Sequence, residues 1–167
     1  YYYCLGQQVT ATLLASALNH AVESGMGKVT VKKLQQKDVD TLYTVAKSMF
    51  ATPRDDSNDR LDAIAIFHSL ADSEKDPHLQ SMVQLGFAYS KENKPLAIKY
   101  FSEAGYIGPH QVSLFNAGRL FAEQQMAAES LEFFQAAVRA DGKKYSHSEM
   151  TKTSKEAYDT LCEQLVY

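Results

Sequence analysis

The sequence is short of the residues that mark disulfide-rich, nucleic-acid-binding and membrane-spanning proteins. Its two cysteines, Cys4 and Cys162, lie at opposite ends, as expected for a reducing intracellular compartment; one disulfide joining the ends stays an open alternative. Seventeen Lys and Arg stand against twenty Asp and Glu, and this net charge of −3 disfavours a protein that covers nucleic-acid phosphates. No apolar run approaches the roughly 20 residues that cross a bilayer. We therefore expect neither nucleic-acid binding nor membrane insertion of this segment.

Length and composition suit one folded domain. The chain has 167 residues, of which 45% are hydrophobic and 22% charged, unlike collagen-like, coiled-coil-only or disordered chains. A globular chain of this length buries roughly 70% of its unfolded surface and needs neither metal nor disulfide to be stable. The sequence begins at Tyr1 rather than Met, so we expect a fragment or a processed product.

Proline and glycine are also scarce, with four and eight residues, and this leaves long stretches open to helix formation. The β-leaning run at 29–31 is too short to predict a strand, so we expect an all-α protein. Residues 1–39 are interpreted as an N-terminal helix, ended by Gly25 and Gly27, and a polar linker or short helix. The apolar stripe of that helix, at helical spacing, consists of Val9, Leu13, Leu14, Ala17, Leu18, Ala21 and Val22.

Two later segments repeat each other with a period of 32 to 33 residues. In each, a large apolar residue is followed four positions later by Gly and three positions after that by an aromatic residue. A second pattern then places Phe four positions after a small residue, with another small residue three positions further on. The copies are Met82, Gly86, Tyr89, Ala97, Phe101 and Ala104; then Leu114, Gly118, Phe121, Ser130, Phe134 and Ala137; and, more weakly and with residues 52–59 inserted, Leu42, Ala46, Met49, Ala63, Phe67 and Leu70.

This pattern predicts pairs of antiparallel helices that stack, because one pair cannot bury its own apolar face alone. Gly86 and Gly118 fall inside helical patterns, where Gly costs about 1 kcal/mol relative to Ala. We expect each glycine to allow the close approach of a neighbouring helix. The alternative is a set of ordinary amphipathic helices with coincidental spacing.

Residues 40–140 resemble tetratricopeptide repeats, and are most similar to the Sel-one-like variant. The resemblance rests on the small–aromatic–small triplets, on the Gly and aromatic residue of each first helix, and on Pro109, where these repeats often carry a helix-ending proline. It implies an all-α superhelix of about three stacked helix pairs. The sequence departs from the family pattern at Ala46, Leu70 and Gly105.

The C-terminal residues 141–167 are expected to cap the stack. The segment 142–147 reads as a loop, and Ser148 with Thr151 favours the start of a final helix running to Leu165. A capping helix would cover the apolar end of the array, as solenoids require. Its apolar positions are Ala157, Tyr158, Leu161 and Leu165.

No motif for catalysis, metal or cofactor stands out. The five histidines form no metal-binding spacing and are interpreted as surface or capping residues. The acidic stretch 55–59 has calcium-loop residues at its first positions, but Arg60 replaces the turn glycine and Ile66 the closing glutamate. We interpret it as a polar insertion whose last residues cap a helix beginning near Leu61. We expect no cofactor, no metal and no enzymatic activity.

The resemblance implies a concave groove lined by the first helix of each pair, because tetratricopeptide-like arrays bind partners there. Aromatic residues with a few charges suit a protein or peptide partner. The alternative is that Tyr43, Val83, Phe87 and Phe115 belong partly to the core. The groove residues would be Tyr43, Lys47, Phe50, Val83, Phe87, Ser90, Phe115, Arg119 and Glu123.

Two functions from different classes are open on the sequence. The first is a non-enzymatic scaffold or adaptor that binds a protein or peptide partner in the groove. The second is a structural or regulatory segment of a larger enzyme or multiprotein complex. An apolar surface patch larger than a few hundred Å² and a tendency to self-associate would favour the second.

Overall fold

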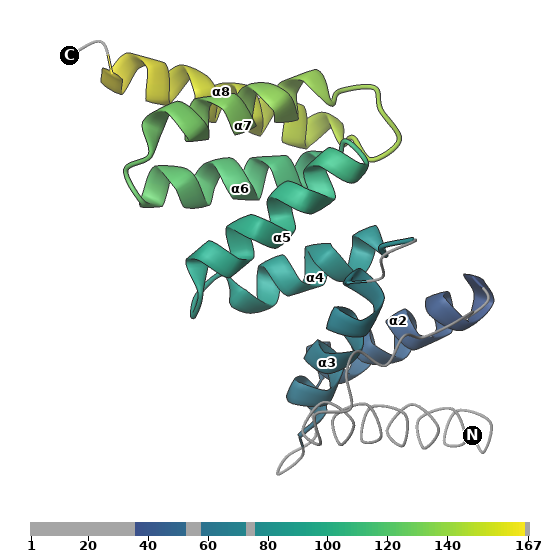
Figure 1. The fold of residues 1–167 in the computed structure, drawn as a ribbon. Helices are drawn as coiled ribbons and strands as arrows, with labels where there is room; N and C mark the ends of the chain where they lie inside the picture. Colours follow the sequence, from purple (N-terminus) through teal and green to yellow (C-terminus); the bar gives the residue numbers. More distant parts are fainter. Residues whose placement is uncertain (1–35, 53–57, 73–75, 166–167) are drawn as a thin grey trace. The chain divides into compact units, whose positions relative to one another are not determined.

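The computed structural model describes residues 36–52, 58–72 and 76–165, and every regular element in them is a helix (Figure 1). The expected all-α class is therefore confirmed for this part of the chain. The N-terminal helix predicted before residue 36 lies outside the described residues. The helices are α2 (Gln36–Ala51), α3 (Asp59–Ala71), α4 (Leu79–Tyr89), α5 (Lys94–Ile107), α6 (Gln111–Glu123), α7 (Ala127–Arg139) and α8 (Ser148–Leu165).

The chain divides into two compact units, residues 1–81 and 82–167. In the first unit α2 packs against α3. Phe67 of α3 is fully buried, and the rings of Tyr43 and Phe50 on α2 lie 6.0 and 6.1 Å from it. The repeat positions of this weaker copy make the core of the pair, with Leu42 half-buried and the others buried: Ala46, Met49, Ala63, Phe67 and Leu70.

In the second unit consecutive helices pack against each other. Contacts join α5 to α6, α6 to α7 and α7 to α8, and α8 also touches α6, so these last three helices lie side by side (Figure 1). On α4, the Phe87 ring packs edge-on against the Phe101 ring of α5, with ring centres 5.1 Å apart. Tyr89 of α4 likewise stacks on Tyr100 of α5 at 6.4 Å.

At each of the two repeat glycines a phenylalanine of the following helix fills the space that a side chain would take. A Cβ atom on Gly86 would come within 2.6 Å of the Phe101 ring, and one on Gly118 within 2.8 Å of the Phe134 ring. Carbon atoms in contact normally stay about 3.5–4.0 Å apart. The absence of a side chain at each glycine therefore makes room for the phenylalanine of the next helix, as the repeat pattern predicted.

Helix α3 begins two residues earlier than expected, at Asp59 rather than near Leu61. Asn58, one of the last residues of the predicted insertion, occupies the N-cap position, but its side chain makes no capping hydrogen bond there. Asp59 and Asp62 instead place two acidic groups in the first turn, where the helix dipole favours them. Burial, and after it the neighbouring charge of Asp59, raises the pKa of Asp62.

The C-terminal helix α8 starts at Ser148 and ends at Leu165, as predicted. It is held by the buried side chain of Gln111, the first residue of α6. The Gln111 amide nitrogen donates to the Ala137 carbonyl at 2.9 Å and to the Thr151 hydroxyl at 2.8 Å, and its oxygen accepts from the His147 amide at 2.7 Å. One buried amide thus joins α6, α7 and the start of α8.

The apolar side of α8 is less buried than expected for a helix that covers the end of the core. Ala157, Tyr158 and Leu161 are half-buried, but Leu165 is 54% exposed, so its expected place in the apolar contact is wrong. The buried residue of this helix is Ser154. The start of α8 is therefore held by polar contacts, in addition to the apolar contact that was predicted for this helix.

Candidate functional site

The predicted partner-binding residues fall into both units. In the first unit they lie on α2, where Tyr43 and Phe50 are half-buried and Lys47 is exposed. The Lys47 ammonium lies 6.0 Å from the centre of the Tyr43 ring. Arg60 of α3 covers the Phe50 ring at 4.8 Å. Because both rings also pack on Phe67, Tyr43 and Phe50 belong partly to the core of the α2–α3 pair.

In the second unit the aromatic and apolar members differ in exposure. Val83 is 4% exposed and is therefore a core residue, which decides between the two alternatives for this position. Phe115 is half-buried against Phe134, with ring centres 5.6 Å apart. Phe87 is 43% exposed although one edge rests on Phe101. Phe87 is therefore the predicted aromatic residue with the most surface left for a partner.

The charged members form a small cluster with a residue that the sequence reasoning missed. Arg119 and Glu123 pair along α6, and the Lys94 ammonium at the start of α5 lies 2.9 Å from the second Glu123 oxygen. The hydrogen bond from Lys94 lowers the pKa of Glu123 most, partial desolvation opposes it, and the charge of Arg119 lowers it further. Two cations thus share one carboxylate, so the cluster keeps a net positive charge.

These residues gather at one end of the second unit. Phe87 and Ser90 are at the end of α4, Lys94 begins α5, and Glu123 ends α6. The Ser90 hydroxyl donates to the Phe87 carbonyl at 2.9 Å, and the Asn93 side chain caps α5 by accepting from the Leu96 amide at 3.2 Å. The turn is therefore fixed by its own hydrogen bonds. We call the set Phe87, Ser90, Lys94, Arg119 and Glu123 the Phe87 surface.

A second feature is a contact of a histidine ring with a serine three residues later, found once before α4 and once at the start of α6. His110 caps α6, because its Nδ1 atom accepts from the Ser113 amide at 3.3 Å and lies 2.9 Å from the Ser113 hydroxyl. His78, just before α4, has its Nδ1 atom 2.8 Å from the Ser81 hydroxyl. Each histidine follows a proline and precedes the serine by three residues. This Pro-His-x-x-Ser pattern recurs after 32 residues and was a readable signal of the repeat.

Burial lowers the pKa of both histidines. For His110 desolvation is the main cause, and the nearby His147 adds to it. For His78 desolvation also dominates, although the charges of Asp40 and Asp76 oppose it. Both rings are therefore held neutral, which is the form whose Nδ1 atom can accept a hydrogen bond. The expectation that the histidines are surface or capping residues is confirmed for capping at His110, which is only 7% exposed.

In the described ranges no group of three His, Cys, Asp or Glu side chains is placed to hold a metal ion. Within the same ranges no helix has the length and apolar character to cross a membrane. The Phe87 surface offers an exposed ring on α4 and, where the start of α5 meets the end of α6, two cations that share one carboxylate. Comparison with known protein families and with curated protein sequences finds no match.

Proposed function

We propose that the chain is a non-enzymatic scaffold or adaptor built on a tetratricopeptide-like, Sel-one-like helical repeat. It binds a protein or peptide partner through the exposed sides of its first helices. The Phe87 surface is the main contact of the second unit, and Lys47 on α2 is the exposed groove candidate of the first unit, described by itself. The observation that carries the proposal is the exposure of Phe87, a ring that is 43% accessible although one edge packs on Phe101.

The repeated contacts support the repeat assignment. Gly86 with Phe101 and Gly118 with Phe134 are the same close helix contact in two successive pairs. A helical repeat is expected to show the same contact inside successive pairs, since each pair is a copy of one helix–turn–helix unit. The α6–α8 contact also fits this arrangement, because α8 then takes the place of the first helix of a further pair.

The chemistry of the Phe87 surface supports a peptide partner. A rigid ring offers contact area at low entropic cost, and aromatic and arginine side chains dominate binding energy at interfaces. Lys94 and Arg119 can exchange their shared carboxylate for one from the partner, because exposed ion pairs contribute only about 0–1 kcal/mol. The expected partner segment therefore carries an apolar side chain next to an acidic one.

The test is site-directed photo-crosslinking in extracts of the source cells. A crosslinking amino acid replaces Phe87 in one sample and Thr153, an exposed residue of α8, in the matched control. A partner captured at position 87 and not at 153 should be lost when the chain with the crosslinker at 87 also carries Lys94→Ala and Arg119→Ala, provided circular dichroism shows normal folding. A partner captured equally at both positions, or retained by the double variant, would refute binding at this surface.

A segment of a larger complex is a second candidate function. Large apolar side chains exposed outside the Phe87 surface favour it. In the described residues these are Leu61, Tyr106, Ile107, Met126 and Leu165, which are 64%, 68%, 53%, 38% and 54% exposed. Analytical ultracentrifugation of the chain separates the two proposals. A free scaffold should stay monomeric at micromolar concentration, whereas a segment taken from an assembly should self-associate.

A further inference from the structure

The C-terminal turn of α5 carries an aromatic surface separate from the Phe87 surface. Tyr106 is 68% exposed, and its ring meets Phe133 of α7 edge-on with ring centres 5.9 Å apart. Phe133, itself 7% exposed, stacks on Phe121 of α6 at 5.3 Å. Ile107 next to Tyr106 is 53% exposed. We call Tyr106, Ile107, Phe121 and Phe133 the Tyr106 surface.

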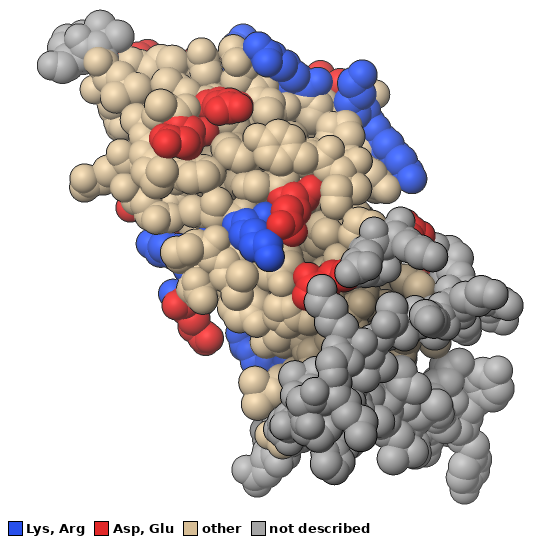
Figure 2. Space-filling view, viewed as in Figure 1, with Lys and Arg blue, Asp and Glu red and all other residues tan. Residues whose placement is uncertain are grey.

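In this surface three rings form a row, from the half-buried Phe121 through the buried Phe133 to the exposed Tyr106. Single exposed apolar residues are ordinary, but here two adjacent ones continue onto a packed aromatic pair. The buried Phe133 holds the Tyr106 ring from one side, so binding a partner on the other side costs little further side-chain entropy. Figure 2 shows largely uncharged surface over the helices of this unit, interrupted by isolated charged groups.

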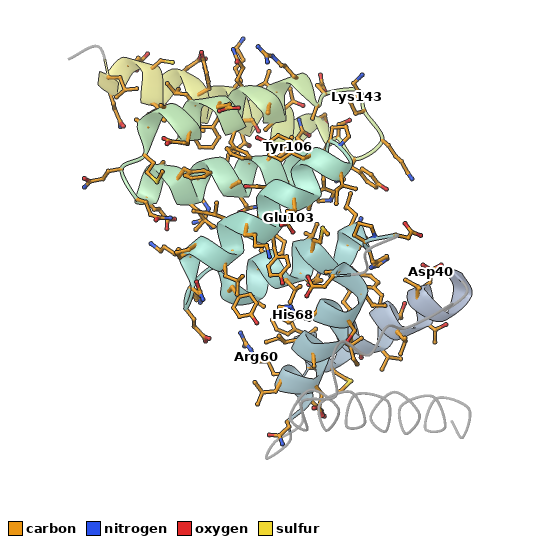
Figure 3. The ribbon with its side chains drawn as sticks, in the orientation of Figure 1. Asp40, Arg60, His68, Glu103, Tyr106 and Lys143 are labelled. Carbon is orange, nitrogen blue, oxygen red and sulfur yellow. The ribbon has the colours of Figure 1, made fainter. Side chains whose placement is uncertain are left out.

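The charges next to these rings are negative. Glu103 lies one turn before Tyr106 on α5, and Figure 3 shows both side chains on the same side of that helix. Glu129 lies one turn before Phe133 on α7. Among the residues three or four positions away from Tyr106 or Phe133, two are acidic, Glu103 and Glu129, and none is Lys or Arg.

One cation does approach this set. Lys99, one turn before Glu103, has its ammonium 4.0 Å from a Glu103 oxygen, and both side chains are about half exposed. A pair at this distance and exposure contributes little, so an incoming cation can replace Lys99. The carboxylates therefore favour a positively charged group over the Tyr106 ring.

We propose that the Tyr106 surface docks an arginine-bearing segment of a protein partner. The guanidinium stacks over the exposed face of Tyr106 with the Glu103 carboxylate one turn away on the same helix, and a neighbouring apolar side chain of the partner covers Ile107. A planar cation is favoured on a tyrosine ring flanked by carboxylates because it satisfies the π-face and the acceptors together. This partner chemistry is opposite in charge to that expected at the Phe87 surface.

The test is selection of 12-residue peptides from a random phage library on the immobilised full chain. The library is first depleted on the Tyr106→Ala variant, so surviving clones require Tyr106. We expect arginine to be at least threefold enriched in these clones over the input library. No surviving clone, or clones without arginine enrichment, would overturn the proposal.

Synthetic peptides from the selected clones give the decisive measurement by fluorescence anisotropy. Replacing the peptide arginine by citrulline, which has the same shape without charge, should weaken binding at least tenfold. Glu103→Gln should weaken it about threefold, and Thr153→Ala, a matched control at an exposed position of α8, should leave it unchanged. Equal binding of the citrulline peptide, or equal weakening by Thr153→Ala, would refute the assignment whether or not the Phe87 surface binds its own partner.

Self-association is the other occupant that the test distinguishes. If the Tyr106 surface joins two copies of the chain, sedimentation velocity will show a concentration-dependent dimer that Tyr106→Ala abolishes. That result would overturn docking of a separate partner. A monomer at all concentrations, together with arginine-dependent peptide binding, is the outcome that the proposal predicts.

Discussion

Substituting Gly86 by alanine tests the close helix contact on which the repeat depends. Three ring atoms of Phe101 lie 2.6 to 2.8 Å from the position a Cβ atom would take. Phe101 is fully buried, so its ring cannot swing into solvent to make room. The added methyl group must therefore push α4 away from α5 or force Phe101 out of its rotamer.

The net effect follows from two opposing terms. Alanine in place of glycine inside a helix gains about 1 kcal/mol. Overpacking a filled core costs about 1–3 kcal/mol, and overlap with three ring atoms at once places Gly86→Ala near the upper end. We therefore expect the free energy of unfolding to fall by about 2 kcal/mol.

Urea unfolding followed by circular dichroism measures this loss. A double-mutant cycle with Phe101→Leu identifies its cause, because the smaller side chain leaves space for the methyl group. The double variant should be more stable than the sum of the single effects predicts, by at least about 1 kcal/mol. A Gly86→Ala variant that is more stable than the wild type would refute the contact.

Two further predictions concern polar groups of the second unit. Gln111→Leu removes the amide that joins α6, α7 and α8. Because its buried partners lose their hydrogen bonds, the free energy of unfolding measured in urea should fall by about 2 kcal/mol. An unchanged free energy of unfolding would contradict this role. The pKa of His110 is lowered in the folded state, so the unfolded state binds the proton more readily and stability should fall as the pH drops below about 6.5. Thermal melts between pH 5 and 8 should show a weaker pH dependence in His110→Asn, which keeps a capping side chain without titrating; an identical pH profile would exclude His110 as the source.

The positions of the core residues could be read from the sequence with some success. Phe101, Phe134 and Phe67 were predicted from spacing alone and are 0%, 4% and 0% exposed. The close contacts at Gly86 and Gly118 were also predicted, because a glycine inside a helical pattern needs a packing reason. The Pro-His-x-x-Ser contacts were equally local and could have been found.

The candidate sites were less accessible to sequence reasoning. Val83 and Phe87 were both predicted to line the groove, yet Val83 is buried and Phe87 is exposed. Helix periodicity gives the angle between side chains, but it does not show where a neighbouring helix ends. The place of Lys94 was not predicted, because its contact with Glu123 joins the start of α5 to the end of α6. Such contacts depend on how the helices cross.

The sequence by itself determined the helical class of the described residues and which side of most repeat helices is buried, because both depend on local propensity and on a period of 3.6 residues. The tertiary structure decided which exposed side chains stand together. It placed Tyr106 on Phe133 and brought Gln111 into contact with α7 and α8, residues 26 to 40 positions away. Contacts of this range are fixed by the packing of whole helices, which no local pattern specifies.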